Sequence, residues 1–172
     1  MWNEQIIMML LEGIKDTLYM TLTSTLIGYV IGLPMGILLT VTDKDGIHPN
    51  TAVYKVLDVI ANLIRSVPFL ILLIVLIPFT RFLIGRSYGP TATIVPLVIA
   101  AAPYIARMVE SSLKEVDAGV IEAARSMGAS NFTIVTKVML VEARTSLIVG
   151  ATISLGTILG SVSYTHLRAH ET

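Results

Sequence analysis

Long uncharged stretches of mostly apolar residues recur along the chain, and shorter charged stretches separate them. The hydrocarbon core of a bilayer is about 30 Å thick, so a helix needs about 20 apolar residues to cross it. Residues 17–41, 87–106 and 145–165 meet this length without a charged side chain. Residues 59–80 also meet it if Arg65 lies near one membrane face, with its long side chain reaching towards water. The pattern predicts an all-α, polytopic membrane protein with four spans.

The residues before the first span have a helical pattern of their own. Ile6, Leu10, Ile14 and Leu18 recur every four residues, whereas the acidic side chains of this stretch fall on other faces. A short helix with one apolar face is typical of a segment that lies in the membrane interface. We therefore expect residues 1–16 to form an interfacial segment that is separate from the first span.

Glycine and proline refine the predicted spans. Gly28, Gly32 and Gly36 recur every four residues in the first span, a spacing that lets two membrane helices approach closely. We interpret them as helix-packing residues. Prolines that can kink a helix lie in or near the spans, because a proline lacks the backbone N–H. They are Pro34, Pro68, Pro78, Pro96 and Pro103.

Composition agrees with a membrane protein. Apolar residues make up 54% of the chain and charged residues 14%, and the mean hydropathy is +0.79. A soluble domain carries about 25% charged residues, so this chain has too little polar surface to face water all round. The net charge is zero and the basic residues are scattered, which gives no sign of nucleic-acid binding. The absence of cysteine excludes disulfides and thiolate metal sites.

No constellation typical of an enzyme is visible. The sequence lacks the phosphate-binding motif G-x-x-x-x-G-K-[ST], the zinc motif H-E-x-x-H and the nucleophile motif G-x-S-x-G. We expect no catalytic residue, no metal site and no cofactor in this chain. Any ATP hydrolysis would then belong to a partner. A channel and a structural membrane scaffold remain as alternatives to a transporter.

The distribution of basic residues predicts the orientation in the membrane. One side holds Lys15, Arg81 and Arg86. The other side holds Lys44, Lys55, Arg65, Arg107, Lys114, Arg125, Lys137 and Arg144. Because basic residues gather on the cytoplasmic side, this asymmetry places residues 107–144 inside the cell and the N-terminus outside.

Residues 107–144 carry ten charged side chains but keep a helical pattern. Three positions share one helical face: Val120, Ala124 and Met127. Gly128 is placed to end this helix in a left-handed conformation, and Ser130 is placed to cap a second helix through Lys137. The residues alone allow a protruding pair of short helices, a solvated loop or an interfacial helix.

The run Glu122-Ala123-Ala124-Arg125-Ser126-Met127-Gly128 resembles the EAA signature of ABC importer permeases. That family pattern is Glu-Ala-Ala, three residues, Gly, nine residues and then Ile-x-Leu-Pro. Val138 and Leu140 occupy the expected later positions, and Val141 stands where the family usually has proline. The resemblance implies a type I importer transmembrane domain over residues 17–160. Four of its expected five spans are present, and residues 107–144 form a cytoplasmic coupling loop. It also implies that Glu122, Ala123, Ala124, Gly128, Val138 and Leu140 couple the chain to an ATPase.

Other stretches are similar to the permeases of methionine importers. They include 65–69, 77–81 and 101–107, although permeases for polar amino acids share the Arg-x-x-Pro element of the first. The resemblance implies a permease homodimer in the bacterial plasma membrane that transports methionine, in D or L form, or another amino acid. It further implies two cytoplasmic ATP-binding subunits and an extracytoplasmic substrate-binding protein. After Gly160 the similarity to the family stops, and we expect residues 161–172 to be a non-native tail.

Overall fold

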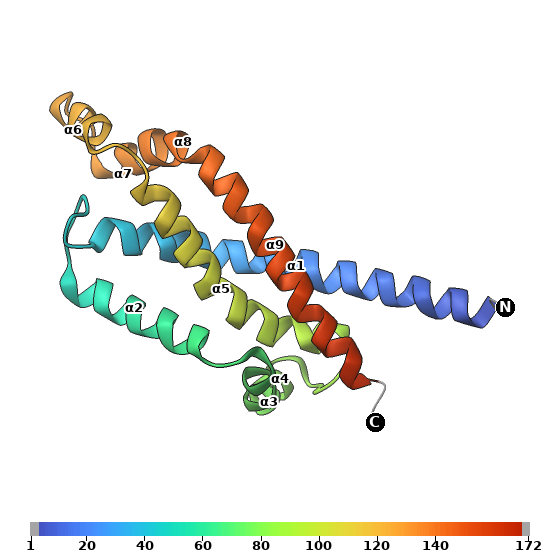
Figure 1. Ribbon diagram of the computed structural model, residues 1–172. Helices are drawn as coiled ribbons and strands as arrows, with labels where there is room; N and C mark the ends of the chain where they lie inside the picture. The colour runs from blue at the N-terminus through green and yellow to red at the C-terminus, as the bar shows by residue number, and fades with distance from the viewer. Residues whose placement is uncertain (1–3, 170–172) are drawn as a thin grey trace.

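The computed structural model describes the backbone of residues 4–169 and the side chains as far as residue 163 (Figure 1). Every regular element in this part of the chain is helical, which confirms the predicted all-α class. The three long helices are α1 (Glu4–Thr42), α5 (Pro90–Lys114) and α9 (Arg144–Ala169). Between α1 and α5 lie α2 (Thr51–Ser66), α3 (Phe69–Val75) and α4 (Ile77–Ile84). Between α5 and α9 lie α6 (Ala118–Ser126), α7 (Asn131–Thr133), the π-helix η1 (Ile134–Met139) and α8 (Leu140–Glu142).

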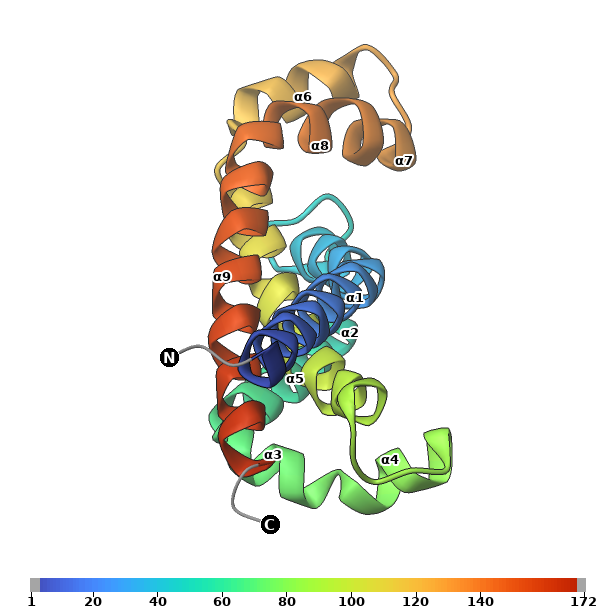
Figure 2. The same ribbon diagram turned by 90° about the vertical axis from the view of Figure 1, so that its right-hand side faces the viewer.

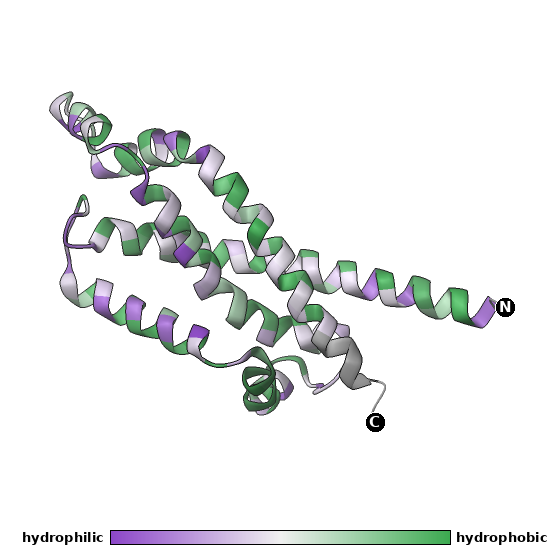
Figure 3. Cartoon of the chain, in the orientation of Figure 1, coloured by the Kyte–Doolittle hydropathy of each residue, from purple (hydrophilic) through white to green (hydrophobic). Residues whose placement is uncertain are grey.

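Helices α1, α5 and α9 are each long and apolar enough to cross a membrane within the described residues, and α2 with α3 makes a fourth candidate if this bent pair is one span. Apolar residues follow most of α1 and α5, whereas polar positions recur along α2 (Figure 3). The expected span at 59–80 does not form one straight helix, because it includes the break between α2 and α3, and the axes of these two helices differ by 102°.

Pro68 explains this break. Its ring disfavours a helical conformation in the preceding residue and it has no N–H to donate. Val67 accordingly has an extended backbone with ψ 124°, and α3 begins directly after the proline. The length of α2 separates Arg65 from the other basic residues that we assigned to the cytoplasm. Arg65 is the second-last residue of α2, and this end of α2 lies away from α6 (Figure 1).

Within the described residues 4–16 the chain forms no separate helix, contrary to our expectation for 1–16, of which the first three residues lie outside the described part. Helix α1 runs without interruption from Glu4 to Thr42. Gly13 is the weakest helix former of this stretch, and Thr17 donates a hydrogen bond of 2.7 Å to its carbonyl. Because the stretch contains no proline, the helix continues into the span.

Helix α5 is the centre of the fold. It packs against α1, α2, α3, α4 and α9, and Figure 2 shows α1 and α9 crossing close to it. Ala101, Ile105, Val109 and Leu113 of α5 are almost fully buried in the main core. The helix extends two turns beyond the predicted end at 106, because the charged side chains that indicated a loop are paired with one another and with neighbouring helices.

The structure places Gly28, Gly32 and Gly36 at the contact between α1 and α5. A Cβ atom added to Gly28 would lie 3.0 Å from Ile105 Cδ1, and one added to Gly36 would lie 2.6 Å from Val109 Cβ. Real Cβ atoms essentially never approach as closely as the Gly36 distance, and few approach as closely as the Gly28 distance. The glycine spacing therefore determines how near the two helices come.

Candidate functional site

Residues 117–142 fold back on themselves as two short arms, which we call the α6–α8 hairpin. The hairpin connects α5 to α9 and projects from one end of the bundle (Figures 1 and 2). Its first arm begins where Asp117 Oδ1 accepts a hydrogen bond of 2.7 Å from the Gly119 N–H. This carboxylate satisfies one of the free N–H groups at the helix start.

The turn between the two arms has a defined geometry. Gly128 adopts φ +81°, the left-handed conformation that its position in the sequence predicted. The Gly128 N–H bonds to Arg125 O at 2.9 Å and the Ala129 N–H to Ala124 O at 3.1 Å, which is the Schellman pattern of a helix end. Ser130 then caps the second arm, because its Oγ accepts a hydrogen bond of 3.2 Å from the Thr133 N–H.

The second arm is longer than the sequence indicated. It runs from Asn131 through the π-helical segment to Glu142 instead of ending at Lys137. Val141 lies inside its last turn. A valine keeps the backbone N–H that the family's usual proline would lack, so the helix does not have to stop at this position.

The inner side of the hairpin packs on the main core. Ala124, Ile134 and Met139 are buried there, and Val138 and Leu140 are half-buried against the same cluster. Three of the six residues that the EAA resemblance singled out therefore hold the hairpin to the bundle: Ala124, Val138 and Leu140. Val120 and Ala124 lie one turn apart on α6 and Met127 is its C-cap, but of these three positions only Ala124 is buried.

The outer end of the hairpin exposes two large apolar side chains. Met127 is 82% exposed and Phe132 is 77% exposed, one on either side of the Gly128 turn. Our sequence analysis did not single out Phe132, and it named Met127 only as sharing a helical face with Val120 and Ala124. Both residues stand next to turn or capping residues within a charged stretch, and this is the signal that could have identified them.

A cleft of about 490 Å³ lies beneath the first arm. Its wall includes the loop after α1 (Asp43, Asp45, Ile47), the end of α5 (Lys114) and the side chains of Glu122 and Arg125 from α6. Arg125 Nη2 donates a hydrogen bond of 3.3 Å to the carbonyl of Ile47. Glu122 and Ala123 are both exposed, but only Glu122 lines the cleft.

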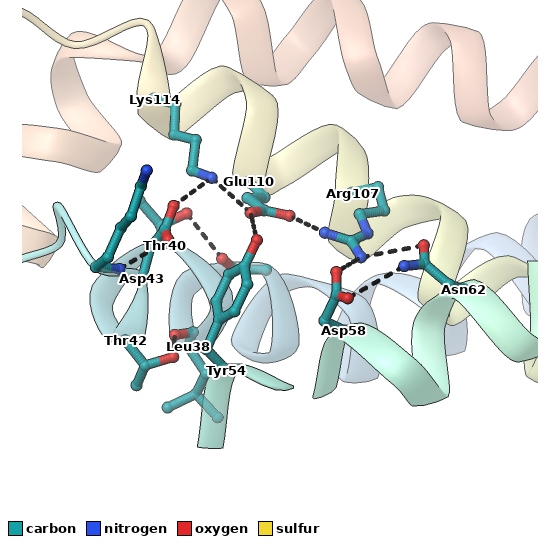
Figure 4. A network of polar contacts seen from close by, with 12 residues as sticks. Leu38, Thr40, Thr42, Asp43, Tyr54, Asp58, Asn62, Arg107, Glu110 and Lys114 are labelled. Carbon is teal, nitrogen blue, oxygen red and sulfur yellow. Dashed lines mark hydrogen bonds and ion pairs between the residues drawn. The ribbon is translucent and has the colours of Figure 1, made fainter. Parts of the chain in front are cut away.

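A charged network connects three elements below this cleft (Figure 4). Arg107, Glu110 and Lys114 lie at i, i+3 and i+7 along one face of α5. Glu110 accepts hydrogen bonds from Arg107 Nη1 at 2.7 Å and from Lys114 Nζ at 2.8 Å. Its side chain is only 6% exposed, so both cations compensate a largely buried carboxylate.

The outer members of the network belong to α2 and to the loop after α1. Arg107 Nη2 pairs with Asp58 and donates to Asn62 Oδ1 at 3.1 Å. Lys114 Nζ lies 2.6 Å from Asp43 Oδ2. The hydrogen bond from Lys114 holds the pKa of the Asp43 carboxyl below its usual 3.8, against the opposing effect of burial, so Asp43 is ionised at neutral pH.

With this arrangement established, the class of protein follows. The chain belongs to the family described as the binding-protein-dependent transport system inner membrane component, which matches residues 7–166. The match extends past Gly160, where we expected the similarity to stop. Membership makes the chain a multi-pass inner-membrane transport component rather than an enzyme.

Individual relatives carry a more specific description. The D-methionine transport system permease protein MetI of Salmonella typhimurium is 49% identical over 158 residues, which are 92% of this chain and 73% of the relative. The protein of the same name from Escherichia coli K12 is also 49% identical over 158 residues, with the same coverage.

Two solved structures of ABC transporters also superpose on this chain. A chain of the MetNI methionine ABC transporter in an inward-facing conformation superposes with a TM-score of 0.92 at 47% identity, covering 95% of this chain and 76% of that one. An amino acid ABC transporter solved with histidines superposes with a TM-score of 0.66 at 22% identity, which shows a shared fold.

Proposed function

We propose that this chain is the permease subunit of an ATP-driven importer for methionine, in D or L form. The observation that carries the proposal is the α6–α8 hairpin: a rigid, capped protrusion with an EAA-like sequence and two exposed apolar side chains at its tip. Such a patch is typical of a surface that binds another protein. The similarity to MetI proteins at 49% identity supports methionine as the substrate.

The proposed assembly is a homodimer of this permease with two cytoplasmic ATP-binding subunits and an extracytoplasmic substrate-binding protein. The sequence has no phosphate-binding loop, so ATP hydrolysis belongs to the partner. We place the hairpin in the cytoplasm and the N-terminus outside. The basic residues that the sequence assigned to the cytoplasmic side, apart from Arg65, lie at or near the hairpin end of the bundle.

Within the hairpin, Met127, Phe132 and Ala123 form the outer surface that contacts the ATPase in this proposal. Gly128 sets the angle between the two arms, since its left-handed conformation determines where the second arm leaves the turn. Glu122 acts from the cleft side, where Lys114 and Arg125 are the nearby cations of the wall. Ala124, Val138 and Leu140 transmit movement of the arms to the core on which they pack.

Uptake by the complete assembly tests this proposal. The permease, its ATP-binding subunit and its substrate-binding protein are reconstituted in vesicles, and ATP-dependent entry of labelled L-methionine is measured with unlabelled D-methionine, histidine and other amino acids as competitors. We expect both methionine isomers to compete and histidine to have no effect. Competition by a different amino acid alone would reassign the substrate, and entry without ATP would indicate a channel.

A further inference from the structure

We propose that Glu110 is a positioning residue through which movement of the α6–α8 hairpin reaches α2. This inference rests on the proposed function, because it assumes that an ATPase displaces the hairpin. It concerns a route that runs outside the EAA-like signature, through the loop after α1 and through the charged network on α5.

The route begins at α6. Arg125 Nη2 bonds to the Ile47 carbonyl at 3.3 Å, so the first arm of the hairpin is attached to the loop at residues 43–50. That loop is held by its own backbone: His48 N–H donates to Val41 O at 3.0 Å and Asn50 N–H donates to Thr42 O at 2.9 Å. Asn50 Oδ1 in turn caps the start of α2 by accepting from the Val53 N–H at 3.2 Å.

The second step passes through Glu110. One of its carboxylate oxygens binds Lys114, which also holds Asp43 at the start of the loop. The other oxygen binds Arg107, which holds Asp58 and Asn62 on α2. The Tyr54 hydroxyl of α2 lies 3.4 Å from the same carboxylate (Figure 4). Glu110 is therefore the one described residue that contacts both cations of the network and α2 directly.

The charges show why Glu110 matters. The network contains the cations Arg107 and Lys114 and the anions Asp43, Asp58 and Glu110. Without the Glu110 carboxylate each cation keeps one anion, but nothing negative remains between them. The ion pairs are then one on the loop and another on α2, and of the contacts between them the Lys114 ammonium over the Tyr54 ring, 5.8 Å from its centroid, is left. A salt-bridge network that joins several packed elements is the kind of structure that carries coupling between distant sites.

The position of α2 matters because one of its faces is polar and exposed. Lys55, Asn62 and Arg65 lie on this face, while Val56, Val59 and Leu63 are exposed on another. Charged side chains are costly against lipid, so the polar face borders water or protein. Moving α2 with the hairpin would move a polar wall of the membrane domain.

Spin labels at two exposed positions can separate the two movements. The sequence has no cysteine, so Ser126→Cys on the hairpin and Leu63→Cys on α2 each give one label per permease copy. In the reconstituted assembly, the distance between equivalent labels of the two copies is measured by double electron–electron resonance, without nucleotide and with ATP trapped. In the unaltered background we expect ATP to shift both distances.

In Glu110→Gln we expect the Ser126 distance to shift as before and the Leu63 shift to become clearly smaller, because the backbone of the 43–50 loop still connects α6 to the start of α2. Methionine uptake should then fall about fivefold or more while ATP hydrolysis persists, because the coupling and not the enzyme partner is impaired. Asp58→Asn, which cuts the same route at a less buried residue, should give the same separation even if Glu110→Gln folds poorly. Glu115→Gln removes an exposed carboxylate from the end of the same helix and serves as the control.

The outcomes are distinguishable. If both label distances shift in Glu110→Gln and Asp58→Asn as they do in the control, the proposal is overturned. If the Ser126 distance fails to respond to ATP even in the unaltered background, the hairpin is not the site of ATPase coupling and the proposed function fails instead.

Discussion

Gly32 of α1 faces Ile105 of α5 so closely that a Cβ atom on Gly32 would lie 2.8 Å from the Ile105 Cβ and 2.7 Å from the Ala102 carbonyl oxygen. Neither neighbour is the mobile end of a flexible side chain. The two helices touch through backbone and Cβ atoms, so the contact tolerates no additional methyl group without a shift of one helix.

We therefore expect Gly32→Ala to destabilise the folded permease by about 1–3 kcal/mol, the usual cost of overpacking a well-packed core. Gly13→Ala is the matched control, because nothing lies within 4 Å of an added Cβ there and alanine is the better helix former. Thermal unfolding in detergent measures both variants. Equal melting temperatures for the two would contradict the close contact.

The turn of the hairpin gives a second prediction. Gly128 has φ +81° with open space around it, so a substitution there is opposed by backbone strain and not by a clash. Gly128→Val should cost about 1–2 kcal/mol locally and change the angle between the arms, whereas asparagine accepts this conformation more readily. Methionine uptake and substrate-stimulated ATP hydrolysis should fall in Gly128→Val and be largely kept in Gly128→Asn, at equal expression. A parallel loss of expression and uptake would reduce Gly128 to a folding role.

The exposed apolar tip of the hairpin gives a third prediction. Burying a side chain the size of phenylalanine contributes about 1.5–3 kcal/mol, so Phe132→Ser should weaken ATPase binding by a factor of about 10 to 100. Met127→Ser should act in the same direction. Val141→Ser is the control, because Val141 is 53% exposed but lies at the end of the second arm, next to α9. Co-purification of the ATP-binding subunit measures the effect, and unchanged recovery in the Phe132 and Met127 variants would place the docking surface elsewhere.

Single cysteines test the proposed orientation in the membrane. A cysteine at Ser87, in the connection between α4 and α5, should react with an impermeant thiol reagent added to intact cells. Cysteines at Ser126 and Ser130, both exposed on the hairpin, should react only after the membrane is opened. The reverse labelling pattern would turn the molecule over and remove the hairpin from the reach of a cytoplasmic ATPase.

Much of this architecture is a direct consequence of local sequence. Uncharged runs of 20 or more residues require a lipid environment whatever they pack against, so α1, α5 and α9 were predictable. Gly128 and Ser130 were predictable for a similar reason, because turn and capping geometry depends on the residue itself and its nearest backbone neighbours. The small-residue spacing of α1 also indicated a helix contact, although it did not identify α5 as the partner.

Charged residues were harder to interpret. Arg107, Glu110 and Lys114 suggested that a span had ended, whereas each has an opposite charge nearby and the helix continues through them. Their spacing along one helical face was visible in the sequence. Their partners were not, because Asp58 is 49 residues from Arg107 and belongs to a helix whose placement depends on the bend at Pro68.

The sequence by itself thus determined the membrane environment, the three long apolar helices and the turn and cap residues Gly128 and Ser130, since hydrophobic length and turn chemistry act over a few neighbouring residues. Tertiary structure decided which side of that hairpin is buried. It left Met127 and Phe132 exposed, and it brought Glu110 between two cations that hold α2 and the loop after α1. These features depend on contacts between elements far apart in the chain, where burial and charge neutralisation outweigh the preferences of any single residue.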